Sequence, residues 1–236
     1  MPKIVTIHQP NYLPWIGFFS KISHSDCLII GDTYLLGGQS VLNRNKIRTR
    51  SGWSYLTIPI GHKSEGTRIS DLSLPAKNEW QKVHWKMIHD NYANAAYFNL
   101  YKSELEKLYH EQYRRICQLN ENLIQYLLDC FNIKIEILKA SDLGIDPRLE
   151  KTDLMIALLK KAGADIYLSG PSGRIYLEIV KFGQNYIDLK YFNFQHPVYP
   201  QRYPGFEPNM SSIDLLFNTG PMASRIMQNS GNIADS

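Results

Sequence analysis

The chain has 236 residues, 44% of them apolar, so it is long enough to bury a full hydrophobic core. Its 26 lysines and arginines exceed its 22 aspartates and glutamates, and the resulting net charge of +4 is too small to indicate nucleic-acid or membrane binding by itself. Its three cysteines are far apart with no zinc-type spacing, and no segment approaches the ~18 consecutive apolar residues of a membrane helix, which together predict a cytoplasmic protein without a membrane span, signal peptide or metal site.

The first predicted strand, residues 3–7, opens into a loop that is dense in polar and aromatic side chains. Strand ends that open into such loops are where α/β proteins place their ligands. His8 is a candidate general base because an imidazole exchanges protons near neutral pH, although a lone histidine is more often structural. We expect Gln9, Tyr12 and Trp15 to bind substrate beside it.

A second predicted strand, residues 26–31, ends at Asp32, and a short predicted helix over 16–23 connects the two strands. If this unit is a parallel strand–helix–strand unit, His8 and Asp32 emerge at the same edge of the sheet. Asp32 is then a candidate catalytic carboxylate. The alternative is that Asp32 only begins a turn.

A Ser-Gly turn joins two further predicted strands, 43–50 and 53–60, into a hairpin. Every second residue in the first of these strands is a cation: Arg44, Lys46, Arg48 and Arg50. In an extended chain these side chains project from one face, which suits a phosphate group. We take Asn43, Arg44 and Lys46 as candidate substrate-binding residues. A solvated outer face of an edge hairpin is the alternative.

Residues 78–130 change to helical periodicity, and the chain then alternates strands with helices. Strands are predicted over 133–138, 165–169 and 186–192, and helices over 152–161 and 174–182. This pattern predicts an α/β fold with a mixed or mostly parallel sheet, strand–loop–helix units, a basic β-hairpin and a helical insert. We expect residues 1–227 to form a single α/β domain with the insert at about 78–130, and residues 228–236 to form a polar C-terminal tail.

Two later motifs can carry chemistry. A Ser-Gly-Pro-Ser-Gly loop follows the predicted strand 165–169 and leads into a helix N-terminus, where backbone N–H groups can hold a phosphate or carboxylate. Its candidate substrate-binding residues are Ser169, Gly170, Ser172, Gly173 and the nearby Tyr176. A tight turn without a ligand explains the same loop, since it matches no Walker A or dinucleotide-binding pattern.

The second of these motifs is a short predicted helix over 213–218, which begins after a serine cap and stops at Gly220. Asp214 lies in its first turn, where the helix dipole stabilises a carboxylate. It is the third candidate catalytic residue, and the alternative is that it only starts the helix.

Four separated blocks of the chain resemble the WbqC-like protein family. They are HQPNYLPWIGFF at 8–19, NRNKI at 43–47 ahead of WSYLTIP at 53–59, YLSG at 167–170, and SIDLLFNTG at 212–220. The resemblance spans nearly the whole chain in order. It implies a bacterial protein associated with gene clusters for O-antigen and other surface polysaccharides. The chain departs from the family pattern over 32–40, so no role is carried over to that segment.

These observations predict a transferase that adds an acyl or aminoacyl group to a nucleotide-activated amino sugar in surface glycan biosynthesis. His8 would be the base, with Asp32 or Asp214 as its orienting carboxylate, and Arg44 and Lys46 would hold the phosphates. The donor is an acyl or aminoacyl compound, and tRNA is the one nucleic acid that would give the cations a use. No metal cofactor is expected.

Two alternatives remain open. The first is a non-catalytic module that binds a sugar nucleotide or a partner enzyme, and the second is a glycosyl or nucleotidyl transferase. Homo-oligomer formation is compatible with each of them.

Overall fold

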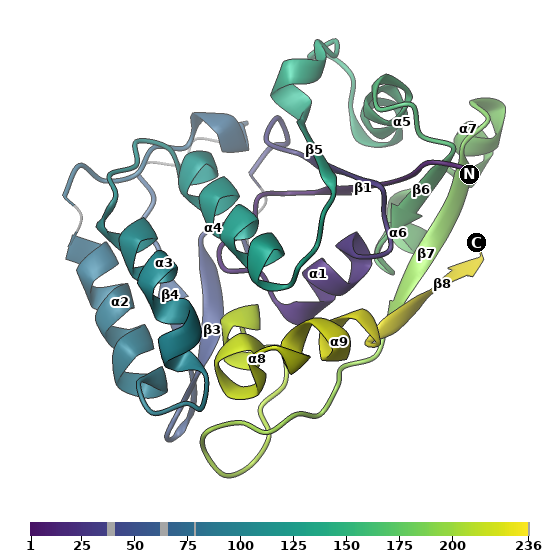
Figure 1. Ribbon diagram of the computed structural model, residues 1–236. Coiled ribbons are helices and arrows are strands. Elements are labelled where there is room, and N and C mark those ends of the chain that lie inside the picture. Colours follow the sequence, from purple (N-terminus) through teal and green to yellow (C-terminus); the bar gives the residue numbers. More distant parts are fainter. Residues whose placement is uncertain (37–40, 62–65, 78, 236) are drawn as a thin grey trace.

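The computed structural model describes residues 1–36, 41–61, 66–77 and 79–235. Its centre is a six-stranded sheet (Figure 1). The strands are β1 (Ile4–His8), β2 (Cys27–Ile30), β5 (Glu136–Lys139), β6 (Ile166–Ser169), β7 (Asp188–Phe194) and β8 (Gly231–Asp235). They lie in the order β5-β2-β1-β6-β7-β8, and all pair in parallel except β8. The predicted mixed, mostly parallel sheet is confirmed.

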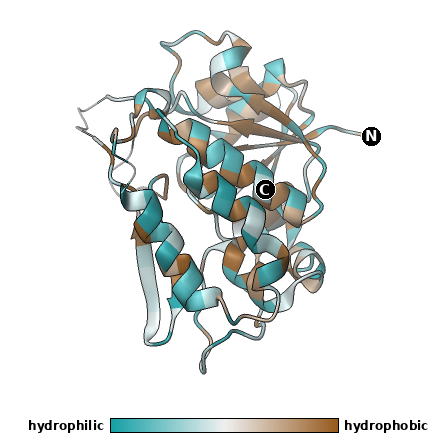
Figure 2. Cartoon of the chain, turned by 60° about the vertical axis from the view of Figure 1, so that its left-hand side comes forward, coloured by the Kyte–Doolittle hydropathy of each residue, from teal (hydrophilic) through white to brown (hydrophobic). Residues whose placement is uncertain are grey.

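Helices cover both faces of this sheet because neighbouring residues of a strand point to opposite sides. The helices α5 (Lys151–Lys161) and α7 (Ile179–Gln184) pack on one face, where Val5 and Ile7 of β1 point. The helices α1 (Ile16–Ile22) and α9 (Met222–Gln228) pack on the other face, where Leu28 and Ile30 of β2 point. Figure 2 shows the strands as mostly brown, hydrophobic ribbons, while the helices carry both colours. The central strands β1, β2 and β6 are therefore buried on both sides of the sheet.

The predicted basic hairpin and helical region are also present. The hairpin consists of β3 (Arg44–Thr49) and β4 (Gly52–Thr57), and the helices that pack near it are α2 (Glu79–Tyr92), α3 (Phe98–His110), α4 (Ile116–Cys130) and α8 (Ser212–Thr219). Three short elements complete the chain: the 3₁₀ helices η1 (Ile69–Asp71) and η2 (Ala140–Leu143), and the single turn α6 (Gly173–Tyr176). The start of the predicted insert at residue 78, and residues 37–40 of the segment that departs from the family pattern, lie outside the described residues.

The C-terminal residues correct one expectation. We predicted a polar tail over 228–236, but residues 231–235 form β8, which pairs antiparallel with β7. The strand forms by backbone pairing with β7 along residues 190–194, although its own sequence lacks an apolar alternation. Residue 236 lies outside the described residues.

The strand order reverses the direction of the connections at the centre of the sheet. The chain passes from β1 through α1 to β2 on one side, and it enters β6 on the other side of β1. Connections that leave in opposite directions from two neighbouring strands open a gap at the carboxyl ends of those strands, and α/β proteins bind ligands there. His8 ends β1 and Ser169 ends β6, so both residues lie at this edge.

Candidate functional site

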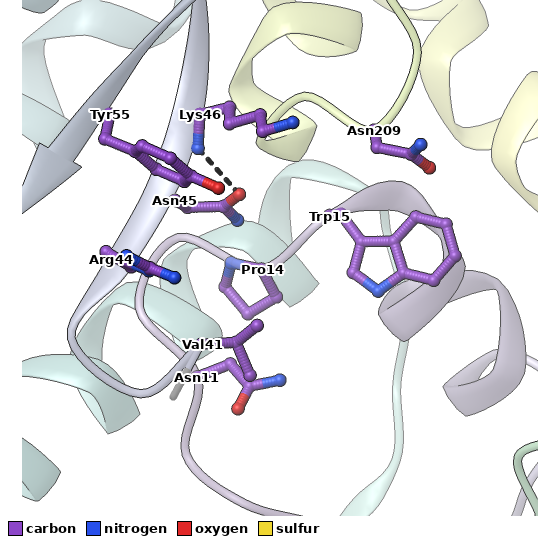
Figure 3. Close-up of a pocket in the computed structure, with 9 residues that line it drawn as sticks. All are labelled: Asn11, Pro14, Trp15, Val41, Arg44, Asn45, Lys46, Tyr55 and Asn209. Atoms are coloured by element: carbon purple, nitrogen blue, oxygen red, sulfur yellow. Dashed lines mark hydrogen bonds between the residues drawn. The ribbon is translucent and has the colours of Figure 1, made fainter. Parts of the chain in front are cut away.

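A cavity of about 350 Å³ lies between the N-terminal loop and the hairpin (Figure 3). It is lined by Asn11, Pro14, Trp15, Val41, Arg44, Asn45, Lys46, Tyr55 and Asn209. Figure 3 shows the indole of Trp15 on one side of this space and Arg44, Lys46 and Tyr55 on the other. Three segments that are far apart in the sequence therefore contribute to one cavity, and three of the predicted substrate-binding residues line it.

The two cations of the cavity lie over aromatic rings of the neighbouring strand. Lys46 Nζ is 4.0 Å from the centroid of a Trp53 ring, and the Arg44 guanidinium carbon is 4.8 Å from the Tyr55 centroid. The antiparallel register explains this arrangement, since it sets Lys46 opposite Tyr55 and places Trp53 two pairs further along, on the same face of the hairpin. Cation–π contacts hold the charges in place while the rings, 44% and 40% exposed for Trp53 and Tyr55, keep them near solvent.

Hydrogen bonds fix the N-terminal loop against this strand. Asn45 Nδ2 donates to the Leu13 carbonyl at 2.5 Å, and the Ser211 N–H donates to the Lys46 carbonyl at 2.8 Å. The Ser212 N–H donates to the Pro14 carbonyl at 2.9 Å. Leu13 adopts a left-handed backbone conformation, with φ of 41°, which a branched residue seldom takes unless its surroundings impose it. The loop is therefore held in one shape beside the two cations.

His8 lies under α1 at the carboxyl end of β1. Its ring centroid is 4.4 Å from that of Phe18, and its Nε2 atom is buried without a hydrogen-bond partner in the described part of the chain. Burial lowers the pKa of His8 well below its usual value, and the nearby charge of Lys21 lowers it further. The imidazole is therefore neutral at physiological pH.

Lys21 is a site candidate that sequence reasoning missed. It follows Phe18 by one helical turn, so it lies on the same face of α1, and only 5% of it is exposed. Helical side chains lean toward the helix N-terminus, which directs the stem of Lys21 back toward His8. Burial lowers its pKa to about 7, and among the described residues no carboxylate or other acceptor pairs with its ammonium group. A lysine inside the otherwise apolar or small run 16–22 was the available signal.

Trp15 connects the cavity with the region around His8. Its indole lines the cavity and lies 4.7 Å from the ring of Phe194 on β7, while α1 starts at the next residue. Gly17 is required here, because a Cβ atom at this position would lie 2.5 Å from the indole. His8 and Lys21 themselves do not line the cavity.

Three of the predicted substrate-binding residues lie elsewhere. Tyr12 is fully buried, and its hydroxyl is hydrogen bonded to His84 Nδ1 at 2.8 Å and to the Tyr109 hydroxyl, so it cannot stack on a substrate base. Asn43 is buried and donates from Nδ2 to the Ile58 carbonyl at 2.9 Å, which fixes the start of the hairpin. Gln9 is partly buried next to His8 and does not line the cavity.

Asp32 lies at the same sheet edge as His8, as the parallel strand–helix–strand unit predicts. The Gly31 N–H donates to the His8 carbonyl at 2.7 Å. The buried carboxylate of Asp32, however, accepts from the Ser141 N–H at 3.0 Å at the start of η2. It stabilises that 3₁₀ helix and is not hydrogen bonded to His8, and its role as orienting carboxylate stays a prediction.

Asp214 is fully buried at the start of α8, away from His8. Its carboxylate accepts from the hydroxyls of Tyr92 and Tyr199, each at 2.9 Å, and from Gln201 Nε2 at 2.7 Å. Burial raises the pKa of Asp214, and these hydrogen bonds oppose the rise. The predicted catalytic set of His8, Asp32 and Asp214 is therefore not brought together.

The four alternating cations do not share one exposed face. Arg48 is only 2% exposed, because residues 203–205 cover it. Its Nη1 atom donates to the carbonyls of Thr49 and Gly52, and its Nη2 atom donates to those of Pro204 and Gly205. Arg50 lies in the turn beyond β3. Arg44 and Lys46 are thus the two of the four that line the cavity.

The Ser169–Gly173 loop closes on itself as a tight turn. Ser169 Oγ donates to the Gly170 carbonyl at 3.1 Å, and the Gly173 N–H donates to the same carbonyl at 3.0 Å. A Cβ atom at Gly173 would collide with Ser169 Oγ, so glycine is required there for packing. Ser172 and Tyr176 are exposed. Phosphate binding by this loop stays a prediction.

The described residues include neither a membrane-spanning helix nor a metal-binding cluster. None of the helices within 1–36, 41–61, 66–77 and 79–235 is both long and apolar enough to cross a bilayer. The same ranges contain no cluster of three or more histidine, cysteine, aspartate or glutamate side chains that could hold a metal ion.

Comparisons with known proteins give one family and one relative. The model of the WbqC-like protein family matches residues 9–226. An uncharacterized protein of Mycobacterium tuberculosis is 32% identical over 223 residues, which cover 94% of this chain and 96% of the relative. No solved structure matches the chain. The matched region includes the whole cavity and the Asp214 helix.

Proposed function

The chain belongs to the WbqC-like protein family, and on that premise we propose that it is a transferase that adds an acyl or aminoacyl group to a nucleotide-activated amino sugar in surface glycan biosynthesis. The observation that carries the proposal is the cavity in which Arg44 and Lys46 lie beside Trp15 and Tyr55. Its volume of about 350 Å³ falls in the range of small-molecule sites.

The groups of this cavity match the parts of a sugar nucleotide. Arg44 and Lys46 supply charge for a diphosphate, and the exposed ring of Tyr55 supplies a stacking surface for a base. Asn11 and Asn209 supply amide groups for sugar hydroxyls, and Asn11 Oδ1 is buried without a partner in the described part of the chain.

Transfer to an amino sugar requires a base. The amine nitrogen attacks the acyl carbonyl carbon, a C–N bond forms, and the bond from that carbon to the oxygen or sulfur of the donor breaks. One proton of the sugar ammonium must pass to a protein base before the attack, and a second proton leaves the attacking nitrogen for the departing oxygen or sulfur of the donor. Lys21 supports the first transfer, because burial lowers its pKa to about 7 and leaves part of it neutral at physiological pH. His8, whose pKa burial also lowers, is neutral and offers a ring nitrogen as hydrogen-bond acceptor beside it. The proposal assigns the amine end of the substrate to the carboxyl end of β1, where His8 lies.

A binding module without chemistry is the second candidate. It is favoured by one observation: the carboxylates of Asp32 and Asp214 are occupied by structural hydrogen bonds, and His8 does not line the cavity. On this reading the cavity holds a sugar nucleotide for another enzyme.

Mass spectrometry separates the two candidates. The purified protein is incubated with UDP-linked and dTDP-linked amino sugars and with acyl-coenzyme A or aminoacyl-tRNA donors. We expect an N-acylated or N-aminoacylated product that His8→Ala and Lys21→Met each abolish while nucleotide binding persists. His24→Ala is the matched control, because His24 follows the same helix but is partly exposed and bonded to the Ser20 carbonyl. Nucleotide binding without product from any donor would support the module, and absence of nucleotide binding would contradict both candidates.

A further inference from the structure

A second cavity, of about 430 Å³, lies beside α8 and apart from the one that holds Arg44 and Lys46. It is lined by Asn94, Ala95, Ala96, Pro200, Gln201, Arg202, Tyr203 and Asn218. The turn between α2 and α3 forms one wall, and residues 200–203 form another. In Figure 1 these walls belong to the lower part of the molecule, around α8 and the long loop that precedes it.

The buried carboxylate of Asp214 holds two residues of the cavity wall in place. It accepts from Gln201 Nε2 at 2.7 Å and from Asn218 Nδ2 at 3.3 Å, and both of these amides line the cavity. Gln201 also bonds both backbone groups of Glu207, accepting from its N–H at 2.8 Å and donating to its carbonyl at 3.0 Å. The walls are therefore held in place without a ligand, which is the preorganisation that a binding site requires.

Arg202 differs from the other arginine of this region. Arg48, nearby, spends its two Nη atoms on backbone carbonyls of residues 49, 52, 204 and 205. The Nε atoms of both arginines are buried without an acceptor, but the Nη atoms of Arg202 have no hydrogen-bond acceptor and no carboxylate among the described residues. Its one neighbour of note is the Tyr203 ring, whose centroid is 5.2 Å from the guanidinium carbon. A buried N–H group without an acceptor costs free energy, so an acceptor from outside the chain is the natural complement.

We propose that this cavity binds the oxyanion group, a carboxylate or a phosphate, of a second small ligand through Arg202. The guanidinium fork matches two oxygens of either group, and its charge is not neutralised from within the described chain. Asn94 and Asn218 lie on the walls, where their amides face polar substituents of the ligand. The site makes use of the Asp214 helix, which the nucleotide cavity does not use, and it stands independently of the transferase proposal.

A titration in a background that lacks the first cation site tests this proposal. In the Arg44→Gln/Lys46→Gln protein, inorganic phosphate and sodium acetate are titrated separately while the arginine Nε–H signals are followed by NMR. We expect saturable shifts of the Arg202 signal with at least one of the two anions. The anion that binds more tightly identifies the class of oxyanion.

Substitutions at Arg202 decide the outcome. Adding Arg202→Gln should weaken that binding at least tenfold, Arg202→Lys should retain part of it, and Arg225→Gln on the exposed surface of α9 should leave it unchanged. Thermal unfolding confirms that each variant is folded. If Arg202→Gln does not fold, the partial loss of binding in Arg202→Lys provides the test. The proposal is overturned if neither anion shifts the Arg202 signal, or if Arg202→Gln binds as tightly as its parent. Either result leaves nucleotide binding at Arg44 and Lys46 untouched.

Discussion

Asp214 and Lys21 are both buried ionisable side chains, and their surroundings are opposite. The Asp214 carboxylate receives hydrogen bonds from Tyr92, Tyr199 and Gln201. The Lys21 ammonium group has no such partner among the described residues, and burial lowers its pKa to about 7. A saturated buried group ties segments of the fold together, whereas an unsaturated one costs stability and is retained for another reason. By this criterion Asp214 is architectural and Lys21 is a candidate for function.

Strand β3 shows the same contrast over two residues. Arg48 is buried and donates to five backbone carbonyls, while Lys46 faces the cavity with aromatic rings as its neighbours. The two cations point to the same side of the strand, so the alternation of the sequence does not distinguish them. The two residues differ because residues 203–205 cover Arg48.

The largest expected effect is on Asp214. Asp214→Ala should lower the free energy of unfolding by about 4 kcal/mol, because it leaves two buried tyrosine hydroxyls and one glutamine amide without their acceptor. Asp214→Asn keeps the shape and part of the acceptor capacity, so it should lose less. Urea denaturation of the three proteins measures both values. A loss below about 1 kcal/mol for Asp214→Ala would contradict the architectural role.

The next effect distinguishes Arg48 from Lys46 on β3. Arg48→Met should destabilise the protein by about 2–3 kcal/mol, since five backbone carbonyls lose a charged donor in a buried place. Lys46→Met, at the cavity, should change stability by less than about 0.5 kcal/mol. Thermal and urea unfolding of both variants provide the comparison. Equal losses of stability in the two variants would show that the deeper burial of Arg48 does not contribute to the free energy of unfolding.

Lys21 should make stability depend on pH. In the unfolded chain its pKa returns to about 10.5, whereas in the folded chain it is about 7. Between these values the unfolded state binds more protons, so the contribution of Lys21 to stability rises with pH, by about 1.4 kcal/mol per pH unit, and the cost of the buried charge is fully present below pH 7.

Lys21→Met removes this dependence and replaces the ammonium group with an apolar one of similar length. It should be more stable than the wild type at pH 6.5, and the difference should shrink steadily as the pH rises to 9. Lys86→Met is the control, because Lys86 is exposed on α2 and should shift stability equally at every pH. A constant difference between Lys21→Met and the wild type would contradict an uncharged, unpartnered lysine at that position.

The sequence allowed the sheet, the hairpin and the helical region to be predicted, because each has a hydrophobic period of its own. It also allowed the N-terminal loop and the first cations of the hairpin to be selected, and Trp15, Arg44 and Lys46 do line one cavity. These features depend on neighbours in the chain or across one turn. The strand at 231–235 was missed because the partner that stabilises it, β7, is nearly forty residues away along the chain.

The roles of the buried polar residues could not be predicted from the local sequence pattern. Tyr12, Asp32 and Asp214 are each of the right chemical type for a site, and each is occupied by a hydrogen bond to a segment far away in the sequence. Lys21 was overlooked for the complementary reason. The apolar run around it hints at burial, but the elements that bury it, α9 and β7, are far away in sequence, and burial is what lowers its pKa.

The most direct test of the account is a calorimetric titration of UDP against the wild type, Arg44→Gln/Lys46→Gln and Arg50→Gln. The account predicts saturable binding to the wild type, at least tenfold weaker binding to the double variant, and no change for Arg50→Gln, because Arg50 lies on the same hairpin but outside the cavity. Weaker binding at higher salt should accompany the wild-type result. Unchanged affinity in the double variant, or an equal loss in Arg50→Gln, would contradict the assignment of this cavity to a nucleotide.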